Sequence, residues 1–138
     1  MIAYLDTSAL LRLVLREPGA LRELRSCEAL VSSEILAVES LRTIDRLRLQ
    51  GALSVEAAAS RRKVVTEWLE AVDLVLLKSP ILARASEPFP TPLGTLDALH
   101  LATALVWRER MHQELILATH DRDLALAGRS FGIEVVGV

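Results

Sequence analysis

The chain opens with Met1-Ile2-Ala3-Tyr4-Leu5-Asp6-Thr7-Ser8, a short apolar run that ends in a carboxylate and two hydroxyls. The apolar run is typical of a buried strand, and Asp6-Thr7-Ser8 is typical of a strand end that caps the following helix. In open α/β sheets, ligands bind outside the carboxyl ends of the strands. Asp6 therefore either points into such a crevice or only caps a helix, and the arrival of other carboxylates at the same place would favour the crevice.

The overall composition indicates one globular domain that spans residues 1–138. Of the 138 residues, 51% are apolar and 25% are charged, which excludes a disordered chain. No apolar run reaches membrane-spanning length, so we expect no membrane partner, and Asp6 within the first apolar segment argues against a signal peptide. Cys27 is the single cysteine, so no internal disulfide can form and a cytoplasmic location is expected.

The charge balance does not by itself indicate a nucleic-acid partner, because the formal net charge is −2. Fourteen arginines against two lysines suit phosphate contacts, but a genome rich in G and C gives the same bias. Aromatic residues make up only 4% of the chain and leave little material for base stacking. A nucleic-acid partner would therefore be bound at its backbone. The three histidines lack a set of cysteine partners, which disfavours a structural zinc site.

Short apolar runs alternate with helix-like segments along the whole chain. Expected strands cover residues 1–5, 29–31, 72–77, 114–118 and 133–136, and expected helices cover residues 9–16, 20–26, 34–50, 55–71, 80–85, 95–110 and 121–128. Three prolines make residues 86–94 a stiff internal loop. This alternation predicts an α/β fold, a three-layer α/β/α sandwich around a short, mostly parallel central sheet.

Aspartate occurs at only six positions, and four of these fall near element ends. Asp6, Asp121 and Asp123 follow predicted strands, and Asp97 stands in the first turn of an apolar helix that we expect to be buried. Capping and the helix dipole would explain each acid singly. Two acids spaced by one residue suggest instead that one caps and the other faces the crevice. His100, on the same apolar helix, is expected to be a hydrogen-bonded core histidine rather than a metal ligand.

Several carboxylates in one crevice repel each other, at roughly 4 kcal/mol for two unit charges about 4 Å apart at an effective dielectric near 20. A divalent cation makes such a group tolerable, and oxygen ligands with retained water are what Mg²⁺ or Mn²⁺ prefers. An ion held in this way binds phosphate oxygens and lowers the pKa of a bound water, so phosphodiester hydrolysis is the expected chemistry. The sequence has no glycine-rich phosphate loop, Gly-x-Ser-x-Gly elbow or Cys/His pair for another mechanism.

In their order and spacing, several stretches resemble the PIN-domain ribonucleases, and among them the VapC-type toxins of bacterial toxin–antitoxin pairs. The stretches are Tyr4–Ser8, Ser33–Glu39, Leu96–Ala104 and Thr119–Leu124, and Phe131–Val136 is similar to the last strand of the family. Together they extend over nearly the whole chain. The resemblance implies a PIN-like fold and an Mg²⁺- or Mn²⁺-dependent endoribonuclease in which a metal-activated water attacks the RNA phosphodiester without a covalent enzyme intermediate.

The resemblance also implies which residues form the site and which partners the protein has. The acidic site, catalytic and metal-binding, would consist of Asp6, Glu39, Asp97 and Asp121, with Asp123 as a fifth metal ligand and Thr7, Ser8 and Thr119 as nearby hydroxyls. The implied partners are an RNA substrate, a second copy of the chain in a homodimer, and a small antitoxin protein that occludes the site.

The helix pattern and the resemblance disagree about Glu39. The apolar stripe of the expected helix lies on another face, so the pattern alone predicts a solvated surface glutamate with Arg42 and Arg46 as helix-spaced partners. Only the spacing of the family motif selects Glu39 over Glu34. The two arginines could also approach RNA phosphates, although a solvated face is the simpler interpretation.

Two other functions stay open on the sequence. A non-catalytic PIN-like module would bind a partner and use its acids only as helix caps, but the presence of all four family acids speaks against it. A phosphoacceptor receiver domain also places acids at strand ends, and it needs an acidic pair after the first strand and a lysine near the last. Here Asp6 is followed by Thr7, and Lys63 and Lys78 lie elsewhere.

Overall fold

The computed structural model describes the whole chain, residues 1–138, and its centre is a five-stranded parallel sheet. The strands are β1 (Ile2–Leu5), β2 (Ala29–Ser33), β3 (Asp73–Val75), β4 (Ile116–Ala118) and β5 (Glu134–Val136), in the spatial order β3-β2-β1-β4-β5. Every neighbouring pair is parallel. The opening stretch of the chain is therefore the central strand, where elements on both sides cover it.

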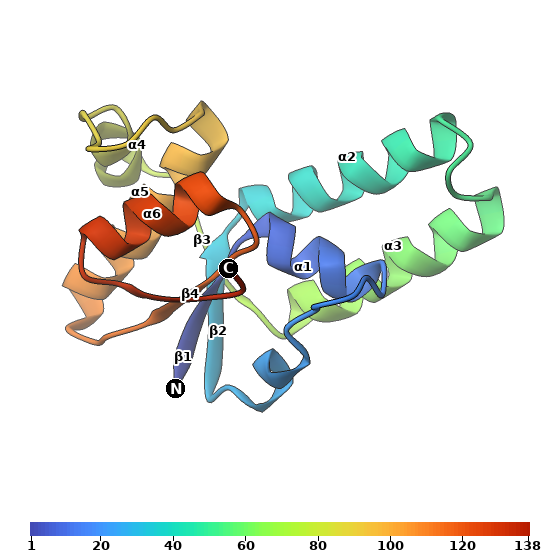
Figure 1. Ribbon diagram of the computed structural model, residues 1–138, viewed down its shortest axis with the longest axis horizontal. Helices are drawn as coiled ribbons and strands as arrows, with labels where there is room; N and C mark the ends of the chain where they lie inside the picture. The colour runs from blue at the N-terminus through green and yellow to red at the C-terminus, as the bar shows by residue number, and fades with distance from the viewer.

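Helices cover both faces of this sheet (Figure 1). They are α1 (Thr7–Val14), the 3₁₀ helix η1 (Arg22–Ser26), α2 (Ile35–Leu49), α3 (Val55–Glu70), α4 (Ser79–Ala85), α5 (Thr95–Met111) and α6 (Arg122–Ser130). The predicted three-layer α/β/α sandwich is confirmed. Two expected elements are shorter than predicted: the segment 20–26 forms only the 3₁₀ helix, and strand 72–77 pairs over three residues.

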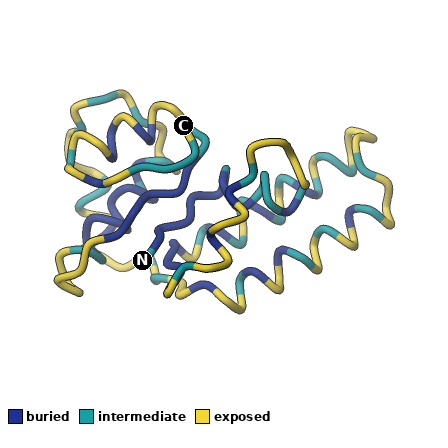
Figure 2. Tube along the Cα trace, turned by 60° about the horizontal axis from the view of Figure 1, so that its bottom comes forward, coloured by how far each residue is buried: buried dark blue, intermediate teal, exposed yellow.

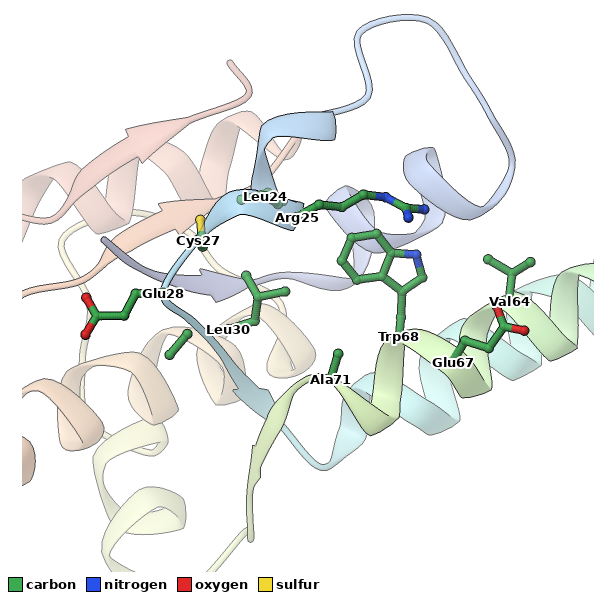
Figure 3. Close-up of a pocket in the computed structure, with 10 residues that line it drawn as sticks. Leu24, Arg25, Cys27, Glu28, Leu30, Val64, Glu67, Trp68 and Ala71 are labelled. Carbon is green, nitrogen blue, oxygen red and sulfur yellow. The ribbon is translucent and has the colours of Figure 1, made fainter.

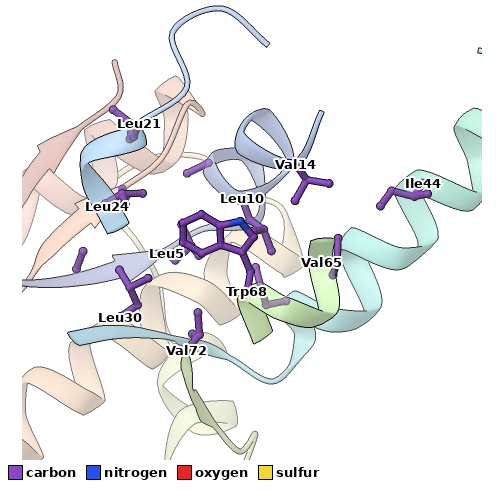
Figure 4. Close-up of a cluster of buried hydrophobic side chains, with 14 of the residues drawn as sticks. Leu5, Leu10, Val14, Leu21, Leu24, Leu30, Ile44, Val65, Trp68 and Val72 are labelled. Atoms are coloured by element: carbon purple, nitrogen blue, oxygen red, sulfur yellow. The ribbon is translucent and has the colours of Figure 1, made fainter. Parts of the chain in front are cut away.

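The alternation of side chains along β1 divides the core into two apolar clusters. Ala3 and Leu5 belong to the cluster under α1, α2 and α3, in which Trp68 is the largest side chain (Figure 4). Tyr4 belongs to the cluster on the opposite face, together with Leu105 of α5. A register slip of one residue would exchange these faces, so the packing fixes the position at which β1 ends.

The carboxyl ends of the strands meet at one edge of the sheet. Leu5 is in register with Ala118, and the amide of Asp6 donates to the Ala118 carbonyl at 3.0 Å. On the far side of β4, Gly137 approaches Thr119 so closely that an added Cβ would lie 2.2 Å from the Thr119 carbonyl oxygen, and its φ is +106°. Only glycine fits this position without strain. These contacts place Asp6 and Thr119 side by side at the carboxyl edge.

A partly apolar cavity of about 400 Å³ lies at the other end of the sheet, beside the amino end of β2 (Figure 3). Its walls come from η1, the start of β2 and α3, and include Leu24, Leu30 and Trp68. The guanidinium of Arg25 lies 5.1 Å from the centroid of the Trp68 ring. Because the strand-end acids lie at the carboxyl edge, this cavity is separate from them.

Helices α2 and α3 pack against each other as a long hairpin that extends beyond the sheet (Figure 1). Buried and exposed positions alternate along both helices (Figure 2), so one face of the hairpin packs and the other meets solvent. None of the helices in the structure has both the length and the apolar character that crossing a membrane requires.

Candidate active site

Asp6 stands where β1 ends and α1 begins, and donors from two strand ends hold its carboxylate. Ser8 donates to Asp6 Oδ2 through its amide at 3.4 Å and through its hydroxyl at 2.6 Å. Thr119, at the end of β4, donates to the same oxygen at 2.8 Å. The side chain is only 5% exposed, and Oδ1 accepts no hydrogen bond. Asp6 therefore caps α1 with one oxygen and keeps the second oxygen free of protein donors.

Glu39, from α2, turns inward and pairs with His100 of α5. His100 Nε2 lies 2.6 Å from Glu39 Oε1, and the Thr7 hydroxyl donates to the same oxygen at 2.8 Å. The Glu39 side chain is 19% exposed, and neither arginine expected as its partner forms an ion pair with it. The interpretation of Glu39 as a solvated surface residue is therefore wrong. The motif spacing, unlike the helix pattern, selected a glutamate that faces the other acids.

A buried chain of hydrogen bonds fixes the orientation of His100. An ionised Glu39 can only accept, so His100 Nε2 carries the hydrogen and donates. Nδ1 then accepts from the Tyr4 hydroxyl, 2.8 Å away. Burial of Tyr4, together with the charge of Asp6, raises the pKa of the phenol far above its ordinary value and keeps it protonated as the donor. His100 is thus confirmed as a hydrogen-bonded core histidine.

Tyr4 is the contact residue that sequence reasoning did not connect with the site. It is the single tyrosine of the chain and stands in an otherwise aliphatic strand. A buried tyrosine hydroxyl needs a partner, so its presence in this strand was the available signal. The partner, His100, lies 96 residues away in sequence, and no local pattern could identify it.

Asp97 lies in the first turn of α5, as predicted, but its carboxylate accepts no hydrogen bond and pairs with no lysine or arginine. The pKa of Asp97 is raised to about 6, chiefly by partial burial and then by the charges of Asp121, Asp6 and Glu39, while His100 acts in the opposite direction. The charges of the three other acids therefore reach Asp97. That these four acids form one site stays a prediction.

Asp121 and Asp123 follow β4 but take different places. Asp121 caps α6, since its Oδ1 accepts from the Leu124 amide at 2.8 Å, and its Oδ2 has no protein donor. Asp123 is exposed in the first turn of α6, and its charge is not among those that raise the pKa of Asp97. Asp121 is thus both the cap and a neighbour of the other acids. A role for Asp123 as a fifth ligand stays a prediction.

The three hydroxyls expected near the acids connect them to their elements. Thr7 contacts Glu39, and Ser8 and Thr119 contact Asp6. The Ser8 and Thr119 hydroxyl oxygens lie 3.2 Å apart, so the ends of β1 and β4 are joined by side chains as well as by the sheet. This network leaves little freedom for Asp6.

Asp6, Glu39, Asp97 and Asp121 have no basic counter-charge from a lysine or arginine. The one side-chain nitrogen within ion-pair distance is His100 Nε2, which also lies 3.7 Å from Asp6 Oδ1. Each of the four retains a carboxylate oxygen without a protein donor, and such an all-oxygen set fits Mg²⁺ or Mn²⁺. No three His, Cys, Asp or Glu side chains are grouped closely enough to hold an ion by themselves. Waters would therefore complete the coordination, as Mg²⁺ usually requires.

Comparison with known proteins agrees with this arrangement. Residues 3–129 match the family model of the PIN domain. Ribonuclease VapC46 of Mycobacterium tuberculosis is 34% identical over 137 residues, which are 96% of this chain and 95% of the relative.

Two solved structures share the fold at low sequence identity. PAE2754 from Pyrobaculum aerophilum has a TM-score of 0.62 and 22% identity, over 99% of this chain and 90% of the other. VapBC-1 from nontypeable Haemophilus influenzae has a TM-score of 0.59 and 15% identity, over 98% of this chain and 96% of the other. The family model and the relative at 34% identity both match nearly the whole chain, and the fold agrees with them: this chain belongs to the PIN-domain family and to its VapC group.

Proposed function

We propose that this protein is a metal-dependent endoribonuclease that acts as the toxin of a toxin–antitoxin pair. The observation that carries the proposal is that the charges of Asp6, Glu39 and Asp121 act on Asp97, while none of these four acids has a lysine or arginine partner. The relative at 34% identity is named a ribonuclease, which supports RNA as the substrate. The reaction adds water across a phosphodiester bond and forms no covalent link to the chain.

The four acids would hold Mg²⁺ or Mn²⁺, with Asp123 as an outer member of the set. When bound, such an ion supplies positive charge for the phosphate oxygens and a water of lowered pKa. The chain's own contribution is to keep the carboxylates in place before the ion and the substrate arrive. Preorganised groups of this kind need no rearrangement during the reaction.

The hydrogen-bonded acids and the unpaired acid would have different tasks. Burial alone would raise the pKa of Glu39, but hydrogen bonds from His100 and Thr7 lower it, so Glu39 stays ionised as a fixed acceptor. Asp97 has a pKa of about 6 and accepts no hydrogen bond. A cation bound beside Asp97 would favour its charged form and lower this pKa. Asp97 is therefore the acid whose unfavourable charge a bound cation would neutralise.

An antitoxin and a second copy of the chain are the protein partners that we propose. The fold is shared with VapBC-1, which supports a partner of the antitoxin kind. A segment that occludes the site must meet four acids that lack a lysine or arginine partner. Leaving such charges buried and unpaired is costly. The occluding segment should therefore present arginine or lysine to them.

Cleavage of total RNA by the purified chain tests the proposed activity. We expect cuts that require Mg²⁺ or Mn²⁺, and a loss of about 100-fold or more in Asp97→Asn, which keeps the shape of the side chain but removes its charge. Asp73→Asn is the matched control, because Asp73 is exposed at the start of β3 and contacts none of the acids.

Each part of the proposal can fail separately in this experiment. Equal cleavage by the wild-type chain and Asp97→Asn would remove Asp97 from the mechanism. Cleavage in excess chelator would remove the metal. A chain that cuts no RNA and gains no stability from either ion would leave the non-catalytic binding module as the better description.

A further inference from the structure

A basic hollow of about 540 Å³ lies on the hairpin of α2 and α3. It is lined by Val38, Leu41, Arg42, Asp45 and Arg48 of α2 and by Arg62 of α3. Three guanidinium groups therefore face a single carboxylate and leave a local charge of about +2, although the whole chain carries −2. The charges are segregated, with acids at the sheet edge and arginines on the hairpin.

Asp45 orients two of the arginines and neutralises only part of their charge. Arg48 donates to Asp45 Oδ1 through Nη2 at 2.9 Å and through Nε at 3.2 Å. Arg42 donates to Oδ2 at 3.2 Å, and its side chain is 70% exposed. The Arg62 side chain forms no ion pair or hydrogen bond. Donors on all three guanidinium groups therefore stay available to an anion in the hollow.

The hollow and the acid site both use residues of α2. Arg42 follows Glu39 by three residues, so the two side chains are neighbours on the helix surface. Arg42 and Arg48 are separated by about 9 Å along the helix axis. At about 3.4 Å per nucleotide of a stacked strand, that length carries two to three phosphates. A strand that runs from Glu39 along α2 would extend over these arginines.

The chemistry of the hollow favours a phosphodiester backbone over a protein segment. The planar fork of arginine matches two phosphate oxygens. Only Val38 and Leu41 supply apolar lining, whereas protein interfaces rely on buried apolar and aromatic anchors. The acids at the sheet edge repel phosphates, so the RNA has to be attracted by charge beside them. We propose that the hollow binds the RNA backbone next to the cleavage site, with Arg42, Arg48 and Arg62 as phosphate contacts.

The inference rests on the proposed function, because it takes RNA as the substrate, but it is tested by binding alone. Fluorescence polarisation with a labelled single-stranded RNA is measured in chelator and in the Asp97→Asn background, at 50–200 mM salt. The test variant combines Arg42→Gln and Arg62→Gln. The control combines Lys63→Gln and Arg110→Gln, which remove equal charge from exposed positions of α3 and α5 outside the hollow.

We expect the test variant to bind about 25-fold more weakly at 0.1 M salt, and its log–log salt slope to fall by about 1.4. Both values follow from about 0.7 in slope per single-strand phosphate contact. The control should change either quantity much less. Neither double substitution should unfold the chain, because exposed ion pairs contribute little to stability, and circular dichroism checks this.

Equal losses in the test and control variants would overturn the hollow as a site and leave only general attraction by charge. Unchanged RNA affinity in the test variant would also overturn it. If poly-glutamate then bound the parent and lost affinity in the test variant, the hollow would belong to an acidic protein partner instead. A chain that binds RNA through the hollow but cuts none would contradict the proposed function and not this inference.

Discussion

The acid site has two halves that differ in how their carboxylates are satisfied. Asp6 and Glu39 accept short hydrogen bonds from hydroxyl and imidazole groups. Asp97 accepts none and stands among like charges. The two carboxyl groups therefore respond to burial in opposite ways. The donors lower the pKa of Glu39, whereas no hydrogen bond offsets the rise in the pKa of Asp97 to about 6, and only His100 acts against that rise.

This difference shows which part of the site the fold builds by itself. The half around Glu39 is held by buried side chains from β1, α1 and α5, so it exists without any ligand. The half around Asp97 is electrostatically unfavourable in the free protein and improves only when a cation or a proton arrives. Stability is lower where activity requires unpaired charge, a trade-off that proteins often show at functional sites.

Replacing His100 by alanine should have the largest effect on stability, because His100 holds the half of the site around Glu39. The change leaves a cavity and removes the partner of both the Tyr4 hydroxyl and Glu39 Oε1, so we expect a loss of roughly 3–4 kcal/mol in unfolding free energy. The pKa of Glu39, followed by carboxyl NMR, should rise, because only the Thr7 hydroxyl would remain to offset burial. Urea unfolding measures the stability loss. His100→Gln, whose amide can still donate to Glu39, should restore part of it, and an equal loss would contradict this account.

Adding Mg²⁺ or Mn²⁺ should offset the charge of Asp97, so that both halves of the acid site are electrostatically satisfied. A cation that binds only the folded chain stabilises it by about 2.7 kcal/mol at 100 times its Kd. Asp97→Asn should lose most of this gain, and Asp73→Asn should keep it. Below about pH 6 the gain should shrink in the wild-type chain, because a proton competes for Asp97. Thermal unfolding with and without the ion, between pH 5 and 8, tests both statements.

The fold could be predicted from the sequence because apolar runs carry it. β1 was recognisable from residues 1–5, and the acids Asp6 and Asp121 were expected where strands end. β3 was predicted too long, since the apolar residues of 72–77 continue beyond the three positions that pair with β2. Hydrophobicity reports burial and does not report where pairing stops.

The half of the site around Glu39 could not be predicted in the same way. Helix periodicity indicates which face meets an apolar core, so it assigned Glu39 to solvent. Its actual partner, His100, lies 61 residues away in sequence, and a helix pattern contains no information about such a contact. The family motif supplied Glu39 from outside the local pattern. The network through Tyr4 became visible only in three dimensions.

Tyr4→Phe is a smaller perturbation of the half around Glu39. It removes one hydroxyl, keeps the ring, and leaves His100 Nδ1 buried without a partner, which should cost about 1–2 kcal/mol. The pKa of Asp97 should change little, because Asp97 has no contact with this chain of hydrogen bonds. Urea unfolding and carboxyl NMR on the same sample test the two halves together. A large shift at Asp97 would show that the halves are coupled.

Asp97→Asn changes the half of the site around Asp97, and it should raise the unfolding free energy where Tyr4→Phe lowers it. The folded chain binds a proton at Asp97 more tightly than the unfolded chain, whose pKa is near 3.8, so unfolding free energy falls as pH rises from about 4 to about 6. Above pH 6 the penalty is complete. Asparagine carries no charge and avoids it. After discounting for partial exposure, we expect the variant to be about 1 kcal/mol more stable than the wild type at pH 7.

The pH dependence separates this effect from a general gain in stability. The difference between Asp97→Asn and the wild type should be small at pH 4 and reach its full size above pH 6. Glu39→Gln should be less stable than the wild type at pH 7, because the lowered pKa of Glu39 stabilises the folded chain above its unfolded value of 4.5. Urea unfolding from pH 4 to 8 in chelator compares the three chains. If both variants shifted stability in the same direction, the claim that the charge of Glu39 stabilises the folded chain and the charge of Asp97 destabilises it would be wrong.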